Sequence, residues 1–218
     1  MKKAFFIPIF VLSSFFAQAQ VESDTVLYSQ KDLREVIVFD DKKEYRLMYG
    51  RAKHYVAKVY PYALLVKDLN AKFNQDLAKI TKESDRKKYI KKANKALKAE
   101  FDGVIRNMSE NEGKYLVKLI HRETGLTAYG IIKKFKGDFS ATTWQTLSRV
   151  GGANLKLKYD LSTKEDYVTE IVLGDVRAGK IKLVKIEVET DMGKMLVSKR
   201  EKRKKEREEK RAKKKASK

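Results

Sequence analysis

The chain has 218 residues, with 50 Lys and Arg against 29 Asp and Glu, and its formal net charge at pH 7 is +21. It contains no Cys, which excludes disulfide bonds, thiolate metal sites and catalysis by a thiol. A hydrophobic content of 42% is enough for a packed domain. Two His cannot supply a three-histidine zinc site, and we expect no metal and no cofactor.

Residues 1–20 have the three parts of a secretory signal peptide. Two Lys at positions 2 and 3 precede 13 uncharged, mostly apolar residues, and an Ala-Gln-Ala site follows at 17–19. The apolar run is shorter than the roughly 20 residues that cross a bilayer as a helix. We therefore expect residues 1–19 to be cleaved after Ala19, and the mature protein to be periplasmic or envelope-associated, without a transmembrane segment.

The mature chain is expected to begin with a flexible segment at 20–32, followed by a single domain at 33–190. The β-branched run at 35–39 predicts a short strand. From 42 to 80 apolar residues recur every three or four positions, which is typical of one helix face. A straight helix of that length would measure roughly 58 Å. We expect Pro61, which cannot donate a hydrogen bond to the carbonyl of Ala57, to kink or break it.

The rest of the domain is also predicted to be largely helical. Ser109 and Glu112 form a capping-box pattern, and Gly125 should end the helix that they begin. Further helices are expected at 84–108, 126–136, 138–150 and from Asp160 or Ser162 to Val172. Strands are expected at 154–159 and, with a bulge, at 181–188. The predicted fold is thus mainly α, a kinked multi-helix domain with a small β element.

Residues 191–218 are predicted to be a basic charged tail. Residues 199–218 hold 13 Lys and Arg, four Glu and no large apolar side chain. Glu stands four residues before Lys three times, which supports a solvated helix, with coil as the alternative. The candidate anion-binding residues are Lys199, Arg200, Lys202, Arg203, Lys204, Lys205, Arg207, Lys210, Arg211, Lys213, Lys214 and Lys215.

Two uses of this tail are open: a solubilising extension, or an electrostatic tether to an anionic surface. The partner would be anionic lipid, lipopolysaccharide or an envelope protein. The same charges would also bind nucleic acid through counterion release. Export makes nucleic acid a poor physiological partner. The oligomeric state is left open.

Three short segments occur in a characteristic order: VYPYA at 59–63, LIHRETG at 119–125, and WQ at 144–145 shortly before RVG at 149–151. Together they resemble an exported bacterial family defined only as domain of unknown function 4294, over about residues 33–180. The resemblance implies export in a double-membrane envelope and brings no assigned activity. It points to these positions as functional candidates: Tyr60, Pro61, His121, Arg122, Thr124, Gly125, Trp144 and Arg149.

The sequence contains none of the common catalytic motifs, such as G-x-S-x-G, a P-loop or H-E-x-x-H. The leading hypothesis is therefore a non-enzymatic binding or scaffold protein of the cell envelope whose tail contacts anionic components. The alternative is an envelope glycan hydrolase that uses carboxylates or His121. A nucleic-acid-binding protein comes third, if the chain is not exported.

Overall fold

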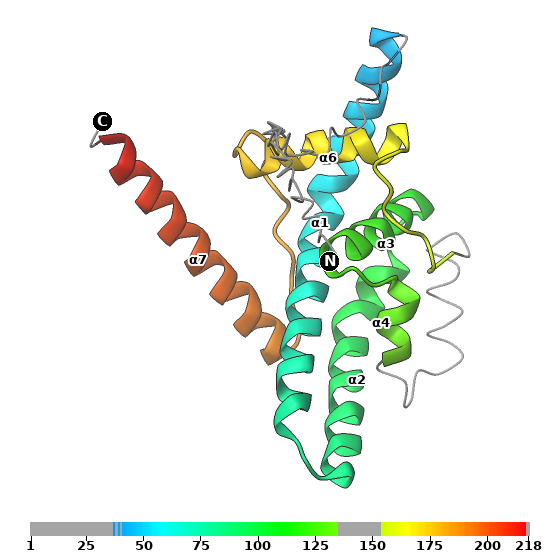
Figure 1. Cartoon of the computed structure of the whole chain (residues 1–218), viewed down its shortest axis with the longest axis vertical. Coiled ribbons are helices and arrows are strands. Elements are labelled where there is room, and N and C mark those ends of the chain that lie inside the picture. The colour runs from blue at the N-terminus through cyan, green and yellow to red at the C-terminus, as the bar shows by residue number, and fades with distance from the viewer. Residues whose placement is uncertain (1–36, 38, 40, 135–153, 217–218) are drawn as a thin grey trace, which may run out of the picture. The chain divides into compact units, whose positions relative to one another are not determined.

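A computed structural model describes residues 37, 39, 41–134 and 154–216 (Figure 1). The described residues are mainly helical, as predicted, and contain no strand. In chain order the helices are α1 (Lys42–Lys79), α2 (Glu83–Arg106), α3 (Glu110–Thr124), α4 (Ala128–Lys134), α6 (Lys164–Arg177) and α7 (Asp191–Ala216). All of them belong to one compact unit, residues 36–218.

Helix α1 continues through Pro61 without interruption, so a break at this residue does not occur. Pro61 has no N–H to offer the carbonyl oxygen of Ala57 four residues earlier. The backbone N–H of Val184 donates to that oxygen instead, at 2.9 Å. A segment far along the chain therefore supplies the hydrogen bond that proline removes, and a buried Pro61 is tolerated inside the helix.

The core is built around α1, which packs against α2, α3, α6 and α7. Figure 1 shows α1 and α2 running side by side as an antiparallel pair, joined at residues 80–82. The fully buried aliphatic side chains come from three helices: Val56, Val59 and Leu65 of α1, Leu119 of α3, and Val168, Val172 and Leu173 of α6. Val56 and Val59 stand three residues apart and Val168 and Val172 stand four apart, so each pair lies on one face of its helix and faces the shared core.

The predicted caps of α3 are confirmed. Ser109 accepts a hydrogen bond from the amide of Glu112, whose carboxylate accepts one from the amide of Ser109. Gly125 ends the helix with φ of 70°, a left-handed conformation that glycine adopts without steric cost. Helix α6 has Thr163 as its N-cap, whereas the sequence predicted a start at Asp160 or Ser162.

The strands predicted at 154–159 and 181–188 are wrong, because neither segment pairs with another strand. The second segment is an irregular stretch along the helices, with Ile181 buried and Ile186 and Val188 packed against the core. A strand requires a neighbouring backbone with unpaired N–H and C=O groups, and helix backbones have already used theirs. The Ala57 carbonyl oxygen is the exception: because Pro61 has no N–H to bond it within the helix, it accepts a hydrogen bond from Val184.

Several predictions lie outside the described residues: the signal peptide at 1–19, the segment at 20–32, the helix at 138–150, Trp144 and Arg149. The strand predicted at 35–39 lies there for the most part. None of the helices that the structure describes combines the length with the apolar composition that a membrane-spanning segment requires.

Candidate functional site

Arg122, near the end of α3, is the centre of a polar cluster that joins α1, α3 and α6. Its Nε and one terminal nitrogen donate to the two carboxylate oxygens of Glu170 on α6, both at 2.7 Å. Its other terminal nitrogen donates to Glu123. Arg177 also contacts Glu170, at 3.1 Å. These residues and those that contact them are called the Arg122 network: Arg122, Glu123, Glu170, Arg177, Tyr60, Lys67, His121 and Tyr159.

Glu123 links this cluster to α1. Its carboxylate accepts hydrogen bonds from the Tyr60 hydroxyl at 3.0 Å and from the Lys67 ammonium at 2.7 Å. Burial raises the pKa of Glu123, but the bonds from Lys67 and Tyr60 and the charge of Arg122 outweigh it, and the pKa is lowered. Burial and the neighbouring carboxylate raise the pKa of Tyr60 to about 12. The Tyr60 hydroxyl therefore stays protonated and donates a hydrogen bond to the ionised carboxylate of Glu123.

Tyr159 and His121 close the network on the side of the segment before α6. The Tyr159 hydroxyl donates to the carbonyl oxygen of Asp166 at 2.8 Å and lies 3.2 Å from Glu170. The Tyr159 amide donates to Nδ1 of His121 at 3.1 Å. That bond occupies Nδ1 as an acceptor, so this nitrogen is not available to take a proton from a substrate.

A second ion cluster lies next to it. Lys118 of α3 donates to Glu165 at 2.7 Å and to Asp166 at 3.0 Å. Burial raises the pKa of Asp166, and the hydrogen bonds from the Asp160 amide and Lys118 oppose that rise. With only 1% of its surface exposed, Asp166 is buried beneath its partners.

These geometries are those of structural contacts between helices. A glycan hydrolase needs a carboxylic acid whose raised pKa lets it protonate the leaving group, beside a second carboxylate. Glu123 and Glu170 are both ion-paired and have lowered pKa values. Asp166 has a raised pKa but is covered by its partners. Within the part of the chain that the structure describes, no group of His, Asp and Glu is arranged to hold a metal ion.

The structure thus brings three of the candidate residues, Tyr60, His121 and Arg122, into one network. The others that it describes act on the backbone: Pro61 within α1, Gly125 as C-cap and Thr124 beside it. The Thr124 hydroxyl donates to the Ile120 carbonyl oxygen at 2.7 Å. The side chains of Tyr60, Arg122 and Thr124, and Nδ1 of His121, therefore all have hydrogen-bond partners within the protein.

The base of α7 is fixed to the body by Glu100 of α2, a carboxylate that is only 4% exposed. It accepts hydrogen bonds from the amides of Glu189 and Thr190, each at 3.0 Å, and from the Thr190 hydroxyl. A Cβ at Gly193 would lie 2.6 Å from a Glu100 oxygen, so any other residue here would have to displace that carboxylate. Leu196 is buried one turn later.

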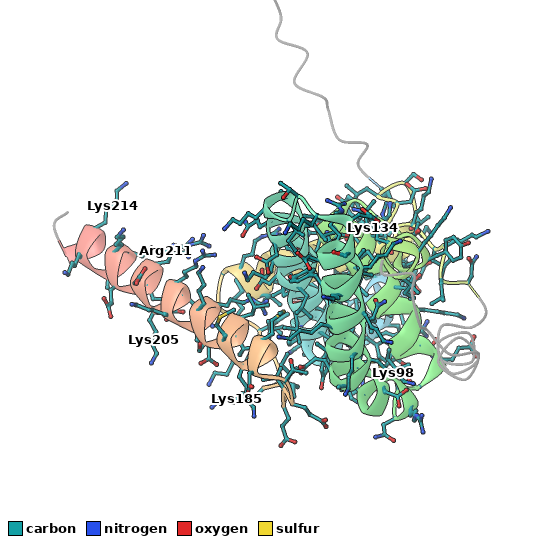
Figure 2. All side chains as sticks on the ribbon, turned by 90° about the horizontal axis from the view of Figure 1, so that it is seen from below. Lys98, Lys134, Lys185, Lys205, Arg211 and Lys214 are labelled. Carbon is teal, nitrogen blue, oxygen red and sulfur yellow. The ribbon has the colours of Figure 1, made fainter. Side chains whose placement is uncertain are left out.

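The remainder of α7 is open to solvent. Arg200, one of the predicted anion-binding residues, forms an ion pair with Asp68 of α1 instead. From residue 201 to 214 every side chain is exposed, and these residues include nine Lys and Arg, four Glu and one Ala. We call residues 201–214 the α7 arm. Figure 2 shows its side chains standing out from the ribbon, Lys205 and Arg211 among them.

The sequence did not reveal the residues that contact Arg122 and the base of α7. Glu100, Tyr159 and Glu170 carry no motif, and a single carboxylate within a Lys-rich helix is indistinguishable from a solvated one. The sequence signal for this contact is Gly193, because a glycine inside a helix, here α7, often marks a close approach.

The chain matches a known protein family. The family model "Domain of unknown function (DUF4294)" matches residues 24–175, which include most of the Arg122 network and end before α7. Neither a curated protein nor a solved structure matches the chain. Because the matched residues make up more than half of the sequence, the chain belongs to the DUF4294 family, whose function is not assigned.

Proposed function

We propose that the protein is an exported, non-enzymatic binding protein whose α7 arm contacts a phosphate-bearing component of the cell envelope. The observation that carries this proposal is the complete exposure of residues 201–214, where nine basic residues face water with four acidic ones. Export rests on the signal-peptide pattern of residues 1–19.

The composition of the α7 arm favours electrostatic contact over insertion into lipid. Helices that insert at a membrane interface bury an apolar face of large residues. The α7 arm has Ala212 as its one apolar residue, so it has nothing to bury. Each Lys or Arg held near an anionic surface gains about 1 kcal/mol, and salt screens that gain within a Debye length of about 10 Å at 0.1 M.

The anchor at the base of α7 supports a binding role over a merely solubilising one. A solubilising tail works in any conformation, because only its charge matters. Here Glu100, Thr190 and Gly193 fix the start of the helix, and Arg200 adds a salt bridge to α1. The body therefore holds the charges in a defined direction, which a solubilising tail does not require.

The test uses residues 20–218 and the same chain without 199–218. Purified lipopolysaccharide and phosphatidylglycerol vesicles serve as phosphate-bearing probes, with phosphatidylcholine vesicles as the neutral control. Tail-dependent binding to at least one anionic probe, weakened by raising the salt, supports the proposal. Binding to neither probe, or binding that ignores both the deletion and the salt, contradicts it. Circular dichroism of the shortened chain checks that the body remains folded.

A further inference from the structure

The basic residues of the α7 arm are not spread evenly around the helix. An α-helix turns by about 100° per residue, so six of them share an arc of about 120°. These residues are Arg203, Lys204, Arg207, Lys210, Arg211 and Lys214. They span about 17 Å along the helix at 1.5 Å per residue. We call this face the basic stripe; all six side chains on it are exposed.

All four acids of the α7 arm lie outside that arc. The rest of the helix surface carries Glu201, Glu206, Glu208 and Glu209 together with Lys202, Lys205 and Lys213. Its charges nearly cancel, whereas the stripe holds six positive charges and no negative one. In Figure 2, Lys214 of the stripe and Lys205 of the other face point to opposite sides of α7. The arm is therefore a helix with one cationic face.

The stripe continues the line along which α7 packs on the body. Gly193 and Leu196 are buried, and Arg200 binds Asp68 of α1. At about 100° per residue these three positions fall in the same arc as the stripe. The cationic face therefore turns toward the side on which α1 lies. A flat bilayer that touched the whole stripe would also meet the body, whereas a narrow chain would not.

We infer that the α7 arm binds through the basic stripe alone, and that the ligand is a flexible chain bearing phosphate groups, seated on the side of α7 that faces the body. This inference rests on the proposed function and narrows it. Lys and Arg both bind phosphate oxygens strongly, Arg through a bidentate fork. The four acids outside the stripe repel the same chain, which restricts it to the arc of the stripe.

Two matched variants test the stripe. K204Q/K210Q/K214Q removes three exposed charges from it, and K202Q/K205Q/K213Q removes three exposed Lys charges from the opposite face. Glutamine and lysine have similar helix propensity, so both variants keep α7 helical, which circular dichroism verifies. The probe is linear inorganic polyphosphate, titrated against the chain without its signal peptide at several salt concentrations. Phosphatidylglycerol vesicles at equal phosphate concentration serve as competitor.

The stripe variant is expected to bind polyphosphate about tenfold more weakly or worse, with a salt dependence shallower by about two in the slope of log K against log salt. The control variant is expected to change by less than about threefold, and vesicles to compete poorly. Equal weakening in both variants, or vesicles that compete as well as polyphosphate, would overturn the inference and leave the proposed function standing. A wild-type chain that binds none of the three anionic probes, polyphosphate, lipopolysaccharide or phosphatidylglycerol vesicles, would overturn both.

Discussion

The attachment of α7 to the body depends on one buried carboxylate, and E100Q probes it with the smallest change of shape. Glu100 accepts hydrogen bonds from the amides of Glu189 and Thr190 and from the Thr190 hydroxyl. Glutamine keeps one acceptor oxygen and replaces the other with an NH₂ group, which then faces an N–H donor. The variant must therefore lose at least one of these bonds and also the charge.

The magnitude follows from these contacts. A hydrogen bond to a charged group contributes about 1.5–3 kcal/mol. A negative charge at a helix N-terminus adds up to about 1 kcal/mol. We therefore expect E100Q to lower the free energy of unfolding by about 2–4 kcal/mol, measured by urea denaturation followed by circular dichroism.

The control is E189Q, which removes an exposed carboxylate from the neighbouring position. It should change the free energy of unfolding by no more than about 0.5 kcal/mol. Amide hydrogen exchange should also accelerate at the first turns of α7 in E100Q and stay unchanged in the control. If E100Q were as stable as wild type and its α7 amides equally protected, Glu100 would not be the anchor that we describe.

Three further predictions concern the fold. G193A should destabilise the protein, although alanine normally improves a helix by about 1 kcal/mol, because its Cβ would lie 2.6 Å from the pinned Glu100 carboxylate; urea denaturation gives the sign. V184P removes the donor to the Ala57 carbonyl and should cost about 1 kcal/mol, and P61A should abolish that cost by restoring the helical donor. Additive effects would refute this link. The contribution of Glu123 and Glu170 to stability should be constant above the ordinary glutamate pKa of about 4.3 and be lost below it, because both have lowered pKa values and lose their bonds only when protonated. A pH-independent free energy of unfolding between pH 7 and 3 would contradict that.

The helices were predictable where local signals act alone. Ser109 and Gly125 were recognisable as helix ends because caps depend on residues within one turn. The long apolar period of α1 was also visible in the sequence. The sequence could not reveal that α1 continues through Pro61, because the N–H that bonds the Ala57 carbonyl comes from Val184, more than a hundred residues away.

The predicted strands failed for the same reason. The pattern at 181–188 does indicate an extended, half-buried segment, and the structure confirms that several of its apolar residues pack on the core. Whether an extended segment becomes a strand depends on a partner elsewhere, which one sequence does not display. Likewise Arg122 was identifiable as a candidate, but its partners Glu170 and Tyr159 were not, because ion pairs across a fold leave no local pattern.

The account rests on the α7 arm as the contact surface, and hydrogen exchange of the protein with and without lipopolysaccharide tests this most directly. Exposed helical amides that open freely should exchange fast in the free protein and slow down on binding. We predict slowing confined to residues 201–214, with α3 and α6 unchanged. Lipopolysaccharide that binds and protects α3 or α6 while the α7 arm exchanges as before would contradict the account.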